Sequence, residues 1–275
     1  MSEPFPTVGL IGEPALVRMM RDPALALGVE IINHIANCSV VSVIGDSMPI
    51  AQVRTLENAG KTLRPNVSTM AYVHAWNQEH LFHEPVDQII SVLVARSAHG
   101  QASAWTPTQT STDKLTTTTP APPLSPGQAG QVTAHSLDLA IESSVIGVME
   151  VEFAIQGGEI RPRKLSLGPT LSGSWTIEGA RTSQFEQHLR AILDLPLGDP
   201  SLVAPHVVTG TFFGEGNLYR PYLHLMARSP GLKFHQYLSG PGQAKGHVTA
   251  MGRDLLELQE CVSHALDYLS GVIDE

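Results

Sequence analysis

Cysteine is nearly absent from this 275-residue sequence, which contains only Cys38 and Cys261. Two cysteines so far apart cannot build a disulfide framework, and they do not form the CxxC spacing of a metal or redox motif. We therefore expect two buried or half-buried free thiols in a reducing cytoplasm. The 12 histidines are scattered and show neither HxxxH nor HExxH spacing, so a zinc site is not expected.

Basic residues and long apolar runs are also scarce. The 17 Lys and Arg residues are outnumbered by 26 Asp and Glu residues, and no basic cluster offers a surface for nucleic acid. The mean hydropathy is only +0.02, and no apolar run approaches the ~18 residues of a membrane span. Residues 1–6 lack the basic and apolar segments of a secretory signal. The sequence thus predicts a cytoplasmic protein without nucleic-acid or membrane partners.

Apolar strands and helices alternate at the beginning of the chain. Residues 8–11 and 29–32 predict two strands, and Pro14 suits the first turn of a helix between them. Residues 40–65 repeat the order strand, helix, strand. This alternation predicts an α/β domain with a parallel sheet.

The turn Gly12-Glu13-Pro14 follows the first predicted strand, where a glycine-rich loop would bind phosphate. It keeps one glycine, and the Glu13 carboxylate faces the place of the anion. Pro14 has no N–H group to donate. The turn therefore does not favour phosphate binding.

The later part of the chain predicts an α+β arrangement. Residues 87–97 form a strong strand pattern, and 100–107 reads as its hairpin partner. The threonine run at 116–119 favours an exposed edge strand, although a linker is an alternative. The other predicted elements are helices over 128–143 and 254–269 and strands over 145–155 and 207–214.

The most specific stretch is SGSWTIEGARTSQFEQHLRAILDLPLGD, residues 172–199. Ser183 followed by Glu186 fits a capping box at the start of a helix. Pro196 ends that helix. Its apolar positions share one helical face and are Phe185, Leu189, Ile192 and Leu193.

This stretch resembles the N5-carboxyaminoimidazole ribonucleotide synthetases, the ATP-grasp carboxylases of purine biosynthesis. TVGLIGEPALVRMM, VDQIISVLVARSAHGQASAWTP, GVMEVEFAI and KFHQYLSGPGQAKGHVTAMG resemble other parts of that family. The resemblance implies a homodimer and three parts. These are a reduced Rossmann-like pre-ATP-grasp domain (1–82), an incomplete ATP-grasp core without the ATP-covering subdomain (83–205), and a small β-rich C-terminal domain (206–275).

The family's reaction phosphorylates bicarbonate with ATP and then carboxylates the amine of aminoimidazole ribonucleotide. Carboxylates must hold magnesium against the phosphates. By resemblance, Glu152 is the first metal carboxylate, and Lys164 stands at the second. The remaining departures are Gly168 for an Arg, Thr170 and Leu171 for His-Asn, Ser174 for a second His, Ile89 for a Glu, and Ser239 and Gln243 for the phosphate-binding Lys and Arg of the lid.

These departures predict a catalytically inactive binding, scaffold or regulatory protein whose partner is unknown, with neither ATP nor Mg²⁺ as cofactor. One alternative is an active synthetase with an atypical site, which would use ATP and Mg²⁺ with Glu152 as a metal ligand. Another is a small-molecule sensor without turnover. Its candidate pocket residues, which can equally form a solvated face or a satisfied polar cluster, are Glu178, Arg181, Gln184, His188 and His247.

Overall fold

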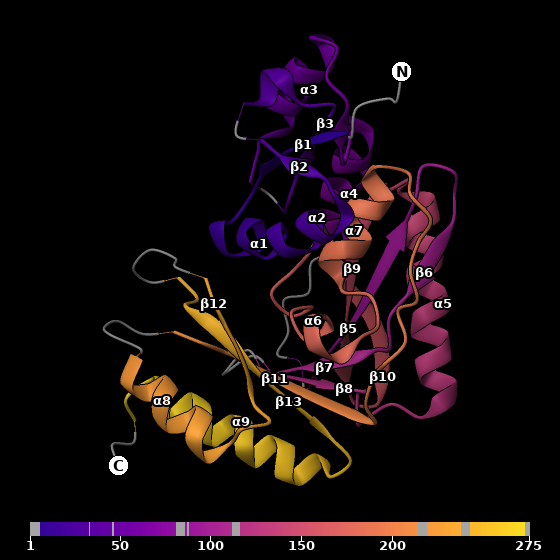
Figure 1. Cartoon of the computed structure of the whole chain (residues 1–275). Coiled ribbons are helices and arrows are strands. Elements are labelled where there is room, and N and C mark those ends of the chain that lie inside the picture. The colour runs from indigo at the N-terminus through magenta and orange to yellow at the C-terminus, as the bar shows by residue number, and fades with distance from the viewer. Residues whose placement is uncertain are drawn as a thin grey trace.

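The computed structural model describes residues 6–32, 34–45, 47–80, 86, 88–111, 116–213, 219–237 and 243–272. Figure 1 shows an N-terminal α/β domain, a central sheet with helices beside it, and two C-terminal helices at the far end of that sheet. The strands are β1 (Thr7–Ile11), β2 (Glu30–Ile31), β3 (Val40–Val43), β4 (Leu63–Arg64), β5 (Gln88–Arg96), β6 (Ala102–Ala104), β7 (Thr108–Thr110), β8 (Thr116–Thr119), β9 (Gly147–Gln156), β10 (Glu159–Leu167), β11 (His206–Phe212), β12 (Lys233–Gln236) and β13 (Gly246–Gly252). The helices are α1 (Pro14–Met19), α2 (Arg21–Leu27), α3 (Ile50–Asn58), α4 (Val67–Glu79), α5 (Pro126–Glu142), α6 (Thr176–Gly179), α7 (Gln184–Ile192), α8 (Tyr219–Arg228) and α9 (Leu255–Leu269), and a 3₁₀ turn covers Ile35–Asn37.

The N-terminal domain contains a parallel four-stranded sheet in the order β2-β1-β3-β4. This confirms the α/β alternation that the sequence predicts. The expected first helix is divided into α1 and α2 at Met20. Pro14 occupies the first turn of α1. N–H groups in the first turn have no partner within the helix, so the missing N–H group of proline costs no hydrogen bond there.

An antiparallel sheet of nine strands runs through the rest of the described chain, in the order β10-β9-β5-β7-β8-β11-β13-β12, with β6 also paired to β5. The hairpin expected over 87–107 forms as β5 and β6. Because β8 pairs with β11, the parts expected over 83–205 and 206–275 share one sheet. The expected boundary at 82/83 lies outside the described residues.

The threonine run is an interior strand, so the expected exposed edge is wrong. Strand β8 lies between β7 and β11, and Thr117, Thr118 and Thr119 are buried. The hydroxyl oxygen of Thr119 lies 2.8 Å from that of Thr108 on β7. A hydroxyl that pairs with another hydroxyl avoids most of the cost of leaving water, which explains how Thr119 fits the interior of this sheet. The buried Thr117 hydroxyl has no hydrogen-bond partner among the described residues.

Alternation along β9 separates an apolar face of the sheet from a polar one. Met149, Val151 and Phe153 lie in a core that helices α4 and α5 cover. Successive strand residues point to opposite faces, so Glu150 and Glu152 point away from that core. Helix α7 and the N-terminal domain cover part of their face, and the candidate site lies there.

Helix α7 attaches the N-terminal domain to the central sheet. Its Phe185, Leu189 and Ile192 side chains are buried in one cluster with Leu16 and Met20 of the N-terminal domain. The predicted apolar face of this helix is therefore confirmed. It packs against another domain, which explains why so short a helix is buried on most sides.

The start of α7 has only half of the expected capping box. The Ser183 hydroxyl accepts a hydrogen bond from the Glu186 N–H group at 3.2 Å. Among the described contacts, the Glu186 carboxylate pairs with Arg190, with 2.6 Å between Oε1 and Nη2. A complete capping box forms instead at Ser125 and Gln128, at the start of α5.

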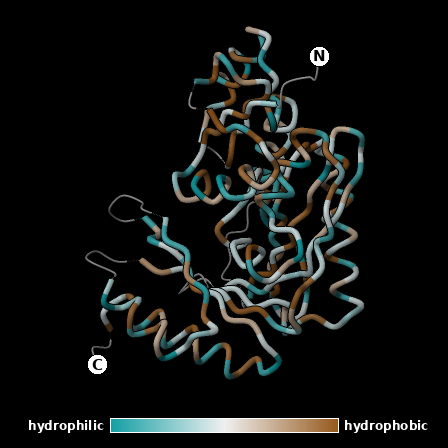
Figure 2. Tube along the Cα trace, viewed as in Figure 1, coloured by the Kyte–Doolittle hydropathy of each residue, from teal (hydrophilic) through white to brown (hydrophobic). Residues whose placement is uncertain are grey.

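The closing helix expected over 254–269 forms as α9. Asp254 caps it and accepts hydrogen bonds from the N–H groups of Leu256 and Glu257 at 3.0 and 3.2 Å. Figure 2 shows hydrophobic and hydrophilic residues alternating along α8 and α9, as expected for helices with one apolar face. Cys38 and Cys261 are free thiols, and Cys38 is buried.

We expect Leu189→Ala to destabilise the protein by about 2–5 kcal/mol, because it removes a fully buried side chain from the contact between α7 and the N-terminal domain. Equilibrium unfolding in urea measures the change. Leu256→Ala is the matched control, since Leu256 is 71% exposed and its loss should cost little. Equal losses for the two variants would contradict this account of α7.

Candidate functional site

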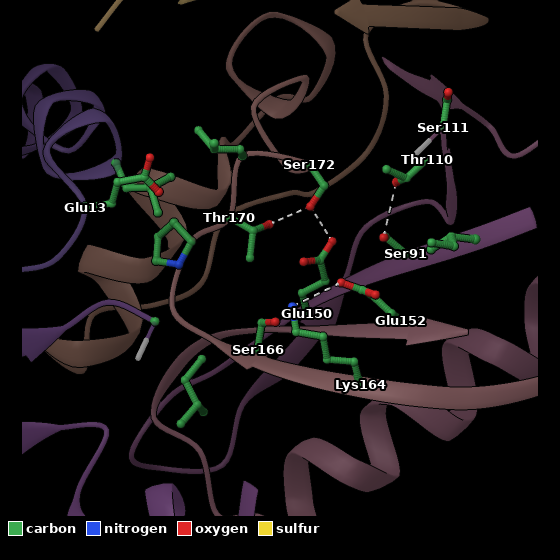
Figure 3. A pocket seen from close by; sticks show the side chains of 16 residues that line it. Glu13, Ser91, Thr110, Ser111, Glu150, Glu152, Lys164, Ser166, Thr170 and Ser172 are labelled. Atoms are coloured by element: carbon green, nitrogen blue, oxygen red, sulfur yellow. Dashed lines mark hydrogen bonds and ion pairs between the residues drawn. The ribbon is translucent and has the colours of Figure 1, made fainter. Parts of the chain in front are cut away.

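A cavity of about 490 Å³ lies between the N-terminal domain and the polar face of the central sheet. Figure 3 shows the side chains that surround it. Four parts of the chain build it: the turn before α1 with α1 itself, Gly45 after β3, strands β5, β7, β9 and β10 with Ser111 after β7, and the loop that follows β10. The lining residues are Glu13, Leu16, Gly45, Ile89, Ser91, Thr110, Ser111, Glu150, Glu152, Lys164, Ser166, Leu167, Pro169, Thr170, Leu171 and Ser172.

Strand register brings the polar side chains of the floor together. Glu152 pairs with Ser91 on β5 and with Lys164 on β10. Glu150 pairs with Ser166 on β10. Directly paired residues point to the same face, so all five side chains point toward the cavity.

Glu152 is balanced by two cations. Its Oε1 lies 3.7 Å from Lys164 Nζ, and its Oε2 lies 3.8 Å from Arg163 Nε. Neighbouring strand residues normally point to opposite faces, but a register shift between Pro162 and Lys164 marks a β-bulge. A bulge sets two residues against one on the partner strand, which lets both cations reach the same carboxylate.

Glu150 is a lining residue of the cavity that the sequence analysis missed. It is only 3% exposed, and the Ser172 hydroxyl donates a hydrogen bond to its Oε1. Burial raises the pKa of the Glu150 carboxyl, and the nearby charge of Glu152 raises it further, against smaller opposing effects of Ser172, Ser91 and Lys164. The available signal was a glutamate two residues before Glu152 in an otherwise apolar strand, since that spacing places both on one face.

Helix α7 holds the loop that forms one wall of the cavity. The Gln184 side chain accepts from the Thr170 N–H group at 3.1 Å and donates to the Thr170 carbonyl at 2.6 Å. The Thr170 and Ser172 hydroxyl oxygens lie 2.9 Å apart. Gln184 was predicted as a pocket residue, but its amide oxygen and amide nitrogen both bond to the main chain, so it positions the wall without lining the cavity.

Gly168 has a structural reason to be glycine. Its φ is +82°, in the left-handed region that favours glycine, and an added Cβ would lie 3.2 Å from the Ile44 Cα. An arginine there would strain the main chain and displace the N-terminal domain. The resemblance places an Arg at this position, so the departure follows the local backbone and packing.

His188 is a buried connector and not a pocket residue. The Val148 N–H group donates to its Nδ1 at 3.0 Å, so its proton lies on Nε2, which donates to the Ser42 hydroxyl at 2.8 Å. Burial lowers the pKa of His188 to about 3. The imidazole is therefore neutral and joins β9 to strand β3 of the N-terminal domain.

The other predicted pocket residues lie apart from the cavity. The Glu178 carboxylate contacts His235 Nε2 at 3.0 Å, and this bond to His235 lowers the pKa of Glu178. Arg181 faces Asp199, with 3.4 Å between the charged groups. His247 is buried beside Tyr237, and burial lowers its pKa. Glu178 and His247 are linked through His235, whose ring stacks on that of His247 with 4.6 Å between centroids. Among the described residues, His247 Nε2 is buried without a hydrogen-bond partner.

Glu152 and the positions at which the sequence departs from the family's pattern divide into two groups. Glu152, Lys164, Thr170 and Leu171 line the cavity together with Ile89. Ser174 is fully buried and Gly168 packs on Ile44, so neither lines it. Of the two predicted lid positions, Gln243 is exposed and Ser239 lies outside the described residues.

The cavity does not fit magnesium with a nucleotide. In the described part of the chain, no group of three or more His, Cys, Asp or Glu side chains could hold a metal ion. Lys164 is the only cation among the described lining residues, too few to balance a triphosphate. Three carboxyl groups line the cavity. Glu13 stands in the turn before α1, Glu152 has two cationic partners, and burial raises the pKa of Glu150.

No helix in the described ranges is long and apolar enough to cross a bilayer.

Sequence comparison supports the resemblance. The ATP-grasp domain family matches residues 78–185. The N5-carboxyaminoimidazole ribonucleotide synthase of Mycobacterium tuberculosis (strain H37Rv) is 40% identical over 203 residues, covering 69% of this chain and 47% of the relative. That of Corynebacterium ammoniagenes is 34% identical over 194 residues, covering 66% of this chain and 47% of the relative. The chain therefore spans about half the length of the curated relatives it matches.

Solved structures share the fold over nearly the whole chain. N5-carboxyaminoimidazole ribonucleotide synthetase from Thermus thermophilus superposes with a TM-score of 0.81 and 20% identity, covering 98% of this chain and 99% of the other. The Aspergillus clavatus enzyme in complex with ADP and 5-aminoimidazole ribonucleotide gives a TM-score of 0.78 and 16% identity, covering 96% and 98%. The resemblance to this ATP-grasp family is confirmed.

The low pKa of His188 predicts a loss of stability in acid. The unfolded chain takes up a proton near the ordinary histidine pKa of 6.5, and the folded protein does so only near 3. Stability should therefore fall as the pH drops from about 6.5 toward 3, by at most about 1.4 kcal/mol per pH unit for this residue. Urea unfolding at several pH values measures the slope, which should be shallower for His188→Gln. The exposed His74→Gln control should keep the native slope.

Glu150→Gln should stabilise the protein near neutral pH. The folded pKa of Glu150 is raised, so the folded protein binds more protons than the unfolded chain as pH rises above the ordinary value, and stability falls in that window. A tenfold difference in proton affinity between the folded and unfolded chains corresponds to about 1.4 kcal/mol. Urea unfolding from about pH 4 to about pH 8 should show the gain only at the higher pH. Glu159→Gln, at a side chain 67% exposed, should show none. A variant less stable than the native protein at the higher pH would contradict this account.

Proposed function

Because the chain is similar in sequence to the N5-carboxyaminoimidazole ribonucleotide synthases and has the ATP-grasp fold of their solved structures, we propose that it binds a small ligand in the 490 Å³ cavity without catalysing ATP-dependent carboxylation. In this proposal it is a non-catalytic binding or regulatory relative. A cytoplasmic location and a homodimer are parts of the same proposal that rest on the resemblance alone.

The observation that carries this proposal is the contact of Glu152 with Lys164, at 3.7 Å. Magnesium prefers several hard oxygen ligands. The resemblance places two metal carboxylates here. Lys164 stands at the position of the second, and its ammonium group pairs with the first, Glu152. The Lys164 side chain is half exposed, so water screens its repulsion of a metal ion. The missing oxygen ligand is therefore the larger deficit, and Arg163 adds to it by holding the other oxygen of Glu152.

Chain length between α4 and β5 supports an incomplete ATP-grasp core. Helix α4 ends at Glu79, and β5 begins at Gln88. The resemblance places a separate ATP-covering subdomain between these two elements. So short a connection has no room for one, so in our proposal this chain has no ATP-covering subdomain of its own at that point.

An active synthetase with an atypical site is the second candidate, and Glu150 is the observation that favours it. Its carboxyl lies on the same face of β9 as Glu152, two residues away. Together they would offer a metal two carboxylates from one strand. Against this, burial of Glu150 favours its neutral form, which binds metal poorly.

The test measures phosphate release from ATP with Mg²⁺, bicarbonate and aminoimidazole ribonucleotide, together with calorimetric titration of ATP and Mg²⁺. We expect neither turnover nor heat of binding from the native protein, because the cavity lacks metal ligands and phosphate-binding cations. Phosphate release that depends on bicarbonate and aminoimidazole ribonucleotide would overturn the proposal.

A pair of variants checks the role of Lys164. Lys164→Glu restores the carboxylate that the resemblance expects, and it should improve binding of ATP with Mg²⁺ if that deficit dominates. Arg161→Glu makes the same change of charge on β10 at a side chain 66% exposed, away from the cavity lining. An equal effect of both variants would mean that net charge, and not the metal position, decides nucleotide binding.

A further inference from the structure

We propose that two copies of this chain form a dimer in which helix α8 of each copy packs against the start of helix α9 of the other. This inference rests on the homodimer of the proposed function and deepens it, because it names the surface that joins the two copies. It follows from three features: an exposed apolar stripe on α8, basic charge beside that stripe, and an exposed leucine among acidic residues on α9.

The inner face of α8 is already occupied. Leu225 is buried in one cluster with apolar residues of β11, β13 and α9. The Tyr222 ring meets the Phe234 ring of β12 edge-on, with 5.1 Å between centroids, and the Phe212 ring of β11 at 6.4 Å. These contacts hold α8 against the sheet and leave its opposite face unused.

The outer face of α8 is apolar as well. Tyr219, Leu223 and Met226 follow one another at intervals of four and three residues, so they share one face of the helix. Their exposed fractions are 66%, 53% and 51%. A helix that packs on a sheet with one side normally carries polar residues on the other. An apolar stripe on the solvent side is typical of a contact with another protein surface.

Charge selects the kind of surface that fits this stripe. Helix α8 contains Arg220 and Arg228 and no acidic residue, although the whole chain carries a net charge of −9. Arg220 is exposed and forms no ion pair with another described residue. A basic helix with an apolar face also suits an anionic membrane, but such a membrane would repel the acidic remainder of the chain. An acidic protein surface with an apolar centre is therefore the better match.

The start of α9 has this combination. Leu256 is 71% exposed, and Glu260 lies on the same side of the helix one turn later. Glu257 is exposed too, as is the capping residue Asp254. Against these carboxyl groups stands Arg253. The surface thus offers a leucine to the apolar stripe and carboxylates to Arg220.

The two surfaces do not meet within one copy. The His224 ring of α8 stacks on that of Tyr268 near the end of α9, with 4.4 Å between centroids. Leu256 lies near the beginning of α9, roughly 18 Å away along the helix axis. In a dimer with twofold symmetry each surface is used twice, because α8 of one copy meets α9 of the other and the reverse. Figure 1 shows both helices at the end of the molecule opposite the N-terminal domain.

Removal of the apolar stripe is the first test. Sedimentation velocity at several protein concentrations measures the dissociation constant of the dimer. Leu223→Ser should weaken the dimer at least about tenfold, because both copies lose a leucine from the contact. Leu25→Ser is the matched control and should change nothing, since Leu25 is 83% exposed on α2 and lies outside both surfaces. Unfolding curves check that both variants are folded.

An exchange of charges tests which surfaces meet. Arg220→Glu alone and Glu260→Arg alone each bring like charges together in both contacts, and each should weaken the dimer about tenfold at low ionic strength. An equimolar mixture of the two variants should restore the native affinity, because every contact then joins opposite charges. Arg161→Glu and Glu159→Arg reverse the same charges on β10, at side chains 66% and 67% exposed, and should leave the dimer unchanged alone and mixed.

The outcomes separate this inference from the proposed function. A dimer that Leu223→Ser leaves intact, or charge variants that do not recover on mixing, would overturn the contact of α8 with α9 and leave the homodimer standing. A native protein that stays monomeric would overturn both. Binding to phosphatidylserine vesicles that Leu223→Ser abolishes would overturn the contact by assigning the stripe to a membrane. Turnover of ATP would overturn the non-catalytic function whether or not the dimer forms.

Discussion

Three polar side chains of helix α7 hold the molecule together. Gln184 forms two hydrogen bonds with the main chain of Thr170, Gln187 forms two with Gly198, and His188 joins Val148 to Ser42. All three are buried, where a polar group left without a partner is costly. One short helix therefore fixes the cavity loop, the segment after α7, the central sheet and the N-terminal domain relative to one another. No aliphatic residue at these positions could satisfy the same main-chain groups.

This constraint separates the shape of the cavity from its chemistry. Gln184 fixes the loop after β10, and His188 fixes strand β9. Both segments therefore keep their positions, although other side chains of the lining differ from the family's pattern. The specific string SQFEQHLRA is accounted for by these contacts and by the apolar face against the N-terminal domain, without any chemical step. A sequence can thus keep the most recognisable segment of an enzyme family for reasons of folding alone.

Local signals predicted much of the fold, and pairing between distant segments explains what they missed. The strand at 8–11 and the capped helix after Asp254 depend on neighbouring residues, so the sequence predicts them directly. The burial of the threonine strand depends on β7 and β11, which no local pattern reveals. The surroundings of Glu178 and His247 were not predictable for the same reason, since His235 bonds to the first and stacks on the second from another segment. Glu150 could have been found from its two-residue spacing to Glu152, but its burial required the tertiary structure.

The character of the cavity follows from a local irregularity in β10. The bulge between Pro162 and Lys164 directs two cations to Glu152, and a regular strand would direct only one of these neighbours to that face. Glu150, two residues earlier, pairs with Ser166 and accepts a hydrogen bond from Ser172, and among the described residues it forms no ion pair. Two carboxyl groups on one face of one strand therefore have different surroundings. Glu152 lies between two cations, whereas Glu150 is buried and accepts a hydrogen bond from a hydroxyl. The two-residue spacing makes these groups look alike in the sequence, and the bulge in β10 distinguishes them, since it directs both cations to Glu152.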